Sequence, residues 1–139
     1  MAFNHLFKRY KYVNTRQYLR LPAAWPIKSK ALSPSTETGP LLSSTRDVSA
    51  GGISLTVRNK MPVGNRLTLE IHVPPLNRSI STEAEVVRCL LTRSGAFDLG
   101  LRFVTITPQD RADLDKAILE FYSEKERARQ QKSWWRKLT

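Results

Sequence analysis

The sequence contains few of the side chains that build metal sites and covalent catalysts. Its 139 residues include one cysteine, Cys89, and two histidines, His5 and His72. A single cysteine cannot form a disulfide within the chain, and these three residues do not have the spacing of a metal-ligand set. This composition fits a reducing compartment. Cys89 lies in an apolar run, and we expect it to be a buried packing residue.

Long apolar runs are also missing. No stretch reaches the length of apolar sequence that a membrane-spanning helix needs. The start, MAFNHLFKRYKY, lacks the apolar core and small-residue cleavage site of a secretory signal. We therefore expect a cytoplasmic protein. A length of 139 residues with 40% hydrophobic content fits one globular domain with a real core.

Acidic residues are scarce relative to basic ones. The chain has 23 Lys and Arg against 12 Asp and Glu, a formal net charge of +11. Much of the excess lies at the ends, because residues 1–20 hold five basic residues and no acid, and residues 125–137 hold six with a single acid. A charge distribution of this kind predicts an anionic partner such as nucleic acid, anionic lipid or a phosphorylated small molecule.

The middle of the chain has the alternating pattern of antiparallel strands. Apolar residues occupy every second position in several short runs that are separated by turn residues. The runs are residues 52–57, 66–73, 80–91 and 97–103. In 80–91 the apolar face switches near Val86 and Val87, which predicts a bulge or a bend. A further hairpin is expected between strands near 21–31 and 41–48, and the whole pattern favours a small antiparallel barrel or sandwich.

The C-terminal part is predicted to be a helix over 108–131. Thr107 can cap it, Pro108 suits its first position, and Asp110 completes a T-x-x-D variant of the capping box. Apolar residues recur at helical spacing up to Tyr122 and then stop. We therefore expect the helix to pack on the barrel first and to project beyond it afterwards.

A basic tail with two tryptophans, residues 132–139, follows the predicted helix. Trp134 and Trp135 stand beside Arg136 and Lys137, a combination that suits contact with a membrane surface or a protein partner. The alternative is that one tryptophan folds back on the barrel or over a ligand and the rest is a solvated tail.

Two arginines four residues apart, Arg16 and Arg20, lie in NTRQYLRL. This spacing puts both on one face of either a helix or a strand. The planar guanidinium makes paired hydrogen bonds to phosphate oxygens or to the O6 and N7 edge of guanine. The alternative is a solvated basic segment, because such pairs are common by chance.

A second polar cluster lies in RDVSAGGISL. Asp47 and Ser49 share a face on an extended strand, and Gly51 and Gly52 allow a close approach of the backbone. A carboxylate accepts hydrogen bonds from a donor edge such as N1–H and N2–H₂ of guanine. The alternative is an ordinary polar turn, since Asp, Ser and Gly are frequent turn residues.

Together, the two clusters resemble the motifs of the PilZ domain family. The matching residues are Arg16 and Arg20 in R-x-x-x-R, and Asp47, Ser49 and Gly52 in [D/N]-x-S-x-x-G. The downstream segments GNRLTLEIHVP and AFDLGLRF resemble further family patterns, so the resemblance covers roughly residues 14–122.

The resemblance implies a mainly β fold, a six-stranded antiparallel β-barrel with a C-terminal α-helix. The expected parts are a basic N-terminal segment (1–20), the barrel (21–107), the helix (108–131) and the tail (132–139).

The resemblance also implies a receptor for cyclic di-GMP, a bacterial second messenger, without enzymatic activity, cofactor or metal. Arg16 and Arg20 would hold phosphates and guanine Hoogsteen edges. Asp47 and Ser49 would hydrogen-bond a guanine and nearby ligand atoms, and Gly52 would shape the turn. Binding would order the N-terminal segment and so alter a surface seen by a downstream protein partner.

Three further residues are accessory candidates for the same site: Thr15, Gln17 and Gly51. Some relatives carry a third arginine where Thr15 stands, and that arginine could stack on a second ligand molecule. Threonine offers no planar cation, so one ligand per site is favoured, although Arg9, Lys11 or the tail could substitute.

Other functions fit the sequence less well. A protein-interaction adaptor of the same fold would be expected to lack motif residues, and none is missing. A barrel that binds single-stranded nucleic acid needs aromatic residues on an exposed strand face, whereas Phe97 and Phe103 lie on the apolar face. An enzyme is disfavoured because VSAGGIS is not a nucleophile elbow and no His or Lys base stands beside Ser49.

Overall fold

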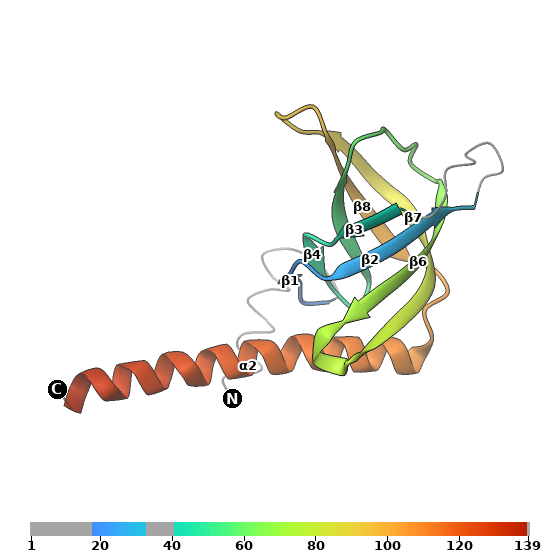
Figure 1. Ribbon diagram of the computed structural model, residues 1–139. Helices are drawn as coiled ribbons and strands as arrows, with labels where there is room; N and C mark the ends of the chain where they lie inside the picture. Colours follow the sequence, from blue (N-terminus) through green and yellow to red (C-terminus); the bar gives the residue numbers. More distant parts are fainter. Residues whose placement is uncertain (1–17, 33–40, 139) are drawn as a thin grey trace.

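The computed structural model describes residues 18–32 and 41–138 (Figure 1). It shows one curled antiparallel sheet with a long C-terminal helix, α2 (Pro108–Leu138), lying across one end of it. The strands are β1 (Leu21–Pro22), β2 (Pro26–Ala31), β3 (Leu41–Ser44), β4 (Asp47–Val48), β5 (Gly52–Val57), β6 (Arg66–Val73), β7 (Arg78–Leu91) and β8 (Phe97–Phe103), with a 3₁₀ turn, η1 (Pro74–Leu76), between β6 and β7. The mainly β fold with a C-terminal helix is confirmed.

The sheet has eight strands in the order β1-β4-β5-β8-β7-β6-β2-β3 where six were expected. The difference arises because each strand of the predicted 21–31 and 41–48 hairpin is interrupted once. At the interruption, the Trp25 N–H donates to the Thr45 hydroxyl at 2.9 Å, and that hydroxyl donates to the Ala23 carbonyl. A buried side chain thus replaces part of the backbone ladder.

The same hairpin makes the sheet curl. Its first half pairs β1 with β4, which leads to β5, and its second half pairs β2 with both β3 and β6. The hairpin therefore touches both ends of the strand order and draws them together. The predicted irregularity is also present, because the β7–β8 register shifts between Val86 and Arg88. Val86 is fully buried, whereas Val87 is half exposed.

The core lies inside the curl. On β6 the alternation predicted from the sequence is realised, since Leu67, Leu69, Ile71 and Val73 are all at most 2% exposed. Fully buried side chains of this size each contribute about 1.5–3 kcal/mol to folding. Cys89 is only partly buried and packs against this core.

Helix α2 covers the core with Leu114, Ala117 and Ile118, which are buried. The Thr107 cap is confirmed, because the Asp110 N–H donates to the Thr107 hydroxyl at 3.1 Å. The Asp110 carboxylate, however, lies 2.9 Å from Arg78 Nη1, and Asp113 lies 2.8 Å from Arg78 Nη2. These hydrogen bonds raise the pKa of Arg78 and fix the start of the helix to the start of β7.

The helix ends later than predicted. It continues from Pro108 to Leu138, so the separate tail expected at 132–139 is helical up to Leu138. The reason is that residues 124–138 contain no proline or glycine that would stop a helix. As expected, the part after Tyr122 projects beyond the sheet (Figure 1). In the described part of the chain no helix is both long and apolar enough to cross a membrane.

Candidate ligand-binding site

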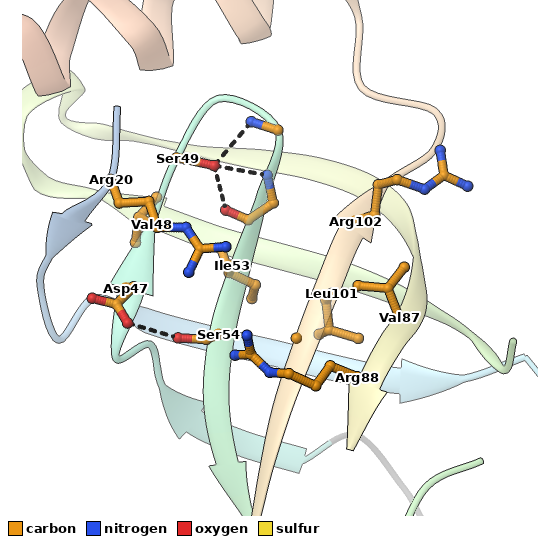
Figure 2. Close-up of a pocket in the computed structure, with 13 residues that line it drawn as sticks. Arg20, Asp47, Val48, Ser49, Ile53, Ser54, Val87, Arg88, Leu101 and Arg102 are labelled. Carbon is orange, nitrogen blue, oxygen red and sulfur yellow. Dashed lines mark hydrogen bonds between the residues drawn. The ribbon is translucent and has the colours of Figure 1, made fainter. Parts of the chain in front are cut away.

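An open cavity of about 240 Å³ lies on the outside of the sheet, over β4, β5, β8 and the bulge of β7 (Figure 2). The residues predicted from the two motifs meet there as far as the structure describes them. Arg20, Asp47, Ser49, Gly51 and Gly52 all line this cavity. The other three predicted residues, Thr15, Arg16 and Gln17, lie outside the described residues.

The Ser49 side chain organises the tight turn between β4 and β5. Its hydroxyl accepts hydrogen bonds from the N–H groups of Gly51 at 3.1 Å and Gly52 at 3.2 Å, and it donates one to the Gly52 carbonyl oxygen at 3.3 Å. The Ser49 N–H also donates to the Gly52 carbonyl at 2.9 Å. Serine at this position therefore has a structural reason, the satisfaction of two backbone donors, in addition to its predicted contact with a ligand.

The two glycines of the turn are needed for different contacts. A Cβ on Gly52 would lie 2.0 Å from the Leu101 carbonyl oxygen of β8, a backbone atom that cannot move aside. A Cβ on Gly51 would lie 3.0 Å from the Tyr18 ring, a side chain that can shift. Gly52 thus permits the close packing of β5 on β8, and Gly51 makes room for an aromatic ring.

Asp47 is held in place by its neighbour across the hairpin. Asp47 pairs with Ser54 in the β4–β5 register, and the Ser54 hydroxyl donates to Asp47 Oδ2 at 3.1 Å. Ser54 is buried, and Asp47 is partly exposed at the cavity. The carboxylate is therefore oriented by one hydrogen bond while it still borders the cavity.

Arg20 comes to the turn through the pairing of β1 with β4. It immediately precedes Leu21, which pairs with Val48. Figure 2 shows its side chain reaching across β4 towards β5, above Ile53. Its backbone carbonyl accepts a hydrogen bond from the Tyr122 hydroxyl of α2. A motif residue from the N-terminal part is thus tied to the C-terminal helix.

Two further arginines, Arg88 and Arg102, line the same cavity and were not predicted as site residues. Arg88 follows the bulge of β7, and its side chain lies over Gly100, where a Cβ would come within 3.3 Å of Arg88 Cβ. The Arg88 Nε–H is buried and has no hydrogen-bond partner among the described residues. Arg102 projects from β8 and pairs with Glu85 of β7.

The sequence held a signal for one of these two arginines. Arg102 lies on the polar face of 97–103, opposite the apolar side chains, so it had to point outwards. For Arg88 the sequence predicted the nearby bulge but not which face the residue takes after it, because the register shift between Val86 and Arg88 resets the alternation.

Arg111, near the start of α2, contacts the two segments that carry the motifs, the β4–β5 turn and the residues before β1. Its Nε donates to the Ala50 carbonyl at 3.2 Å, and its guanidinium lies 5.8 Å from the centre of the Tyr18 ring. Tyr18 stands between the two arginines of R-x-x-x-R, and Ala50 lies within the turn. The helix therefore contacts both the segment before β1 and the β4–β5 turn.

The lining of the cavity carries side chains that could bind an anion. Three arginines and one carboxylate, Asp47, line it, and two of these arginines are near carboxylates outside the lining, Arg88 at 3.8 Å from Asp98 and Arg102 at 2.5 Å from Glu85. Arginine forks bind phosphates, and a carboxylate accepts from N–H donors of a base. The described residues that line it include no His, Lys or Cys, and nowhere in the described chain do three or more His, Cys, Asp or Glu come together as a metal site.

Comparison with solved structures gives the same fold. The inhibitor of motility MotI/DgrA of Bacillus subtilis matches with a TM-score of 0.69 at 24% identity, covering 79% of this chain and 52% of that one. YcgR of Escherichia coli in complex with c-di-GMP matches with a TM-score of 0.67 at 19% identity, covering 84% and 50%. The MrkH–c-di-GMP complex of K. pneumonia matches with a TM-score of 0.61 at 14% identity, covering 81% and 55%.

This chain therefore matches about half the length of those larger proteins. No curated protein sequence matches it significantly. The model of the PilZ domain matches residues 14–120, most of the chain and the whole region that forms the cavity. On this match the chain belongs to the PilZ domain family.

Proposed function

We propose that the protein is a receptor for cyclic di-GMP and that the ligand binds in the cavity between Arg20 and the β4–β5 turn. The observation that carries the proposal is the meeting of Arg20, Asp47 and Ser49 at one cavity in a PilZ domain. The ligand has two phosphates and two guanines. Its phosphates need cations, and the N1–H and N2–H₂ groups of guanine need an acceptor that is fixed in place.

In this proposal the residues divide the work. Arg20, together with Arg16 of the same motif, binds phosphate and the Hoogsteen edge of guanine. Asp47, oriented by Ser54, accepts from the donor edge of a guanine. Arg88 offers a planar, partly exposed guanidinium at the opposite border of the cavity.

Signalling would follow from binding of the ligand between the R-x-x-x-R segment and the β4–β5 turn. Ligand binding would bring the R-x-x-x-R segment against the barrel, and the hydrogen bond from Tyr122 to the Arg20 carbonyl would transmit the change to α2. A downstream protein would then recognise the altered segment or helix. This role is a receptor's and not an enzyme's, because the Ser49 hydroxyl is engaged in its own turn.

Calorimetric titration tests the proposal. The wild-type chain should bind cyclic di-GMP with micromolar or tighter affinity. It should bind cyclic di-AMP far more weakly, because adenine lacks the N1–H and N2–H₂ groups from which Asp47 would accept hydrogen bonds. Arg20→Ala and Asp47→Asn should each weaken binding by about 10- to 100-fold, the range for a charge-assisted hydrogen bond. The matched control is Arg93→Ala in the exposed β7–β8 turn, which should bind as the wild type does.

A wild-type chain that gives no heat with cyclic di-GMP would refute the proposal and favour an adaptor of the same fold. Equal affinity for cyclic di-GMP and cyclic di-AMP would refute the role of Asp47. Mass spectrometry under native conditions would count the ligands, and the absence of arginine at Thr15 leads us to expect one per site.

A further inference from the structure

The end of helix α2 is a projection that the fold does not use. Residues 124–137 are all exposed, whereas Leu114, Ala117 and Ile118 earlier in the same helix are buried. At 1.5 Å per residue, this C-terminal extension (residues 124–138) is about 20 Å long. Figure 1 shows it leaving the sheet and continuing straight.

The extension carries a strong positive charge. Residues 125–137 hold six Lys and Arg and one Glu, a net charge of +5. Four of the cations recur at spacings of four, three and four, which puts them on one side of the helix. They are Lys125, Arg129, Lys132 and Arg136.

This cationic side continues the side that packs on the barrel. Counting back from Lys125 by the same spacings reaches Phe121, Ile118 and Leu114. A helix that paired with a copy of itself would carry apolar residues along such a line. Two copies that met along this line would bring like charges together, so this side of the extension does not favour self-association.

Two large aromatic side chains lie at the far end of the same extension, and helical spacing puts Trp134 opposite the cationic side and in line with Arg127, seven residues earlier. Trp134 is 58% exposed and Trp135 63% exposed, and their ring centres lie 5.4 Å apart in an edge-to-face arrangement. A single-stranded nucleic acid needs aromatic faces that are free to stack with successive bases. These two rings instead pack against each other and form one compact apolar cluster.

We propose that the C-terminal extension binds the surface of membranes that contain acidic phospholipids, with the tryptophan cluster in the interface and the cations beside it, Arg127 and Lys137, on the headgroups. Tryptophan prefers the headgroup region, and each cation near an anionic bilayer adds to the attraction. The contact is peripheral. It goes beyond cyclic di-GMP binding and does not depend on it, although α2 also contacts the candidate site through Arg111 and Tyr122.

Co-sedimentation of the full chain with lipid vesicles tests this proposal. The protein should pellet with phosphatidylcholine vesicles that contain phosphatidylglycerol, should stay in solution with phosphatidylcholine alone, and should be released by high salt. The emission of Trp134 and Trp135 should shift to the blue on binding, since Trp25 is already buried at 7% exposure and contributes a constant background.

Two double variants test the two parts of the surface. Arg127→Gln with Lys137→Gln should weaken vesicle binding by about tenfold or more, because the two cations on the side of Trp134 are lost. Trp134→Ala with Trp135→Ala should weaken it by a similar factor at unchanged charge. The matched control, Lys28→Gln with Lys30→Gln on exposed positions of β2, removes the same charge elsewhere and should bind as the wild type does.

Three results would overturn the proposal. The first is no sedimentation with the anionic vesicles. The second is equal loss of binding in the β2 control, which would mean that only net charge matters. The third is that the protein binds single-stranded oligonucleotides in preference to vesicles, or forms a dimer in light scattering, and that the tryptophan variant loses this property but still binds vesicles. Urea unfolding of each variant should match the wild type, because the changed side chains are exposed.

Discussion

The two sides of the candidate site are built differently. The turn side, Asp47 to Gly52, is fixed by hydrogen bonds within the chain and by the close contact of Gly52 with β8. The arginine side consists of long side chains that reach over the cavity from three separate strands or strand ends. The turn side is therefore part of what stabilises the fold, whereas the fold needs the arginine side chains much less. Substitutions should separate the two by whether stability or affinity changes.

The largest effect is expected for Gly52→Ala on the turn side. The new Cβ would lie 2.0 Å from the Leu101 carbonyl oxygen, so β5 and β8 must move apart. We expect a loss of about 3 kcal/mol in the free energy of unfolding, measured by urea denaturation, together with loss of ligand binding. Gly51→Ala is the control and should cost much less, because its Cβ meets the movable Tyr18 ring. Equal losses would contradict this account of the turn.

Ser49→Ala should have the next largest effect. It leaves the N–H groups of Gly51 and Gly52 without their present acceptor. The expected cost is about 1–2 kcal/mol in the free energy of unfolding, the usual penalty for a part-buried donor left unsatisfied. Ser49→Thr keeps the hydroxyl and should retain most of the stability. If Ser49→Ala changed ligand affinity alone, the serine would belong functionally with the arginine side.

Arg88→Ala tests the arginine side. The side chain is partly exposed and lies over β8, so its removal should leave urea denaturation nearly unchanged. Affinity for cyclic di-GMP should fall by about tenfold, because a cation that lines the cavity is lost. Calorimetry on Arg88→Ala and on the exposed-turn control Arg93→Ala gives the comparison. A large loss of stability with unchanged ligand affinity would show that Arg88 supports the fold and not the binding of the ligand.

Arg111→Ala should have the smallest effect and should change both properties. Arg111 touches the Tyr18 ring before β1 and the Ala50 carbonyl in the turn. Loss of these contacts should lower stability by about 0.5–1 kcal/mol and weaken binding by a few fold. Thermal unfolding with and without ligand measures both in one experiment. A change in only one of them would show that the helix supports one side of the site alone.

Much of the fold could be predicted from local pattern. The alternation in 66–73 and 97–103, the face switch near Val86 and the Thr107 cap all appear in the structure. These features depend on neighbouring residues, so a short window of sequence contains their cause. The eight-strand count and the helical tail were missed. A break at Thr45 depends on a hydrogen bond across the hairpin, and a projecting helix leaves no apolar pattern.

The motifs alone named the chemistry of the site but not its geometry. Arginines, a carboxylate and a glycine-containing turn at family spacing could be recognised from the sequence alone, because residue type and order are local properties. The approach of Arg20 to the turn depends on the pairing of β1 with β4, and the presence of Arg88 and Arg102 at the same cavity became visible only in the folded chain. The physical reason is that strand pairing and a bulge bring residues from distant segments to one surface, and those contacts are set by the closure of the sheet.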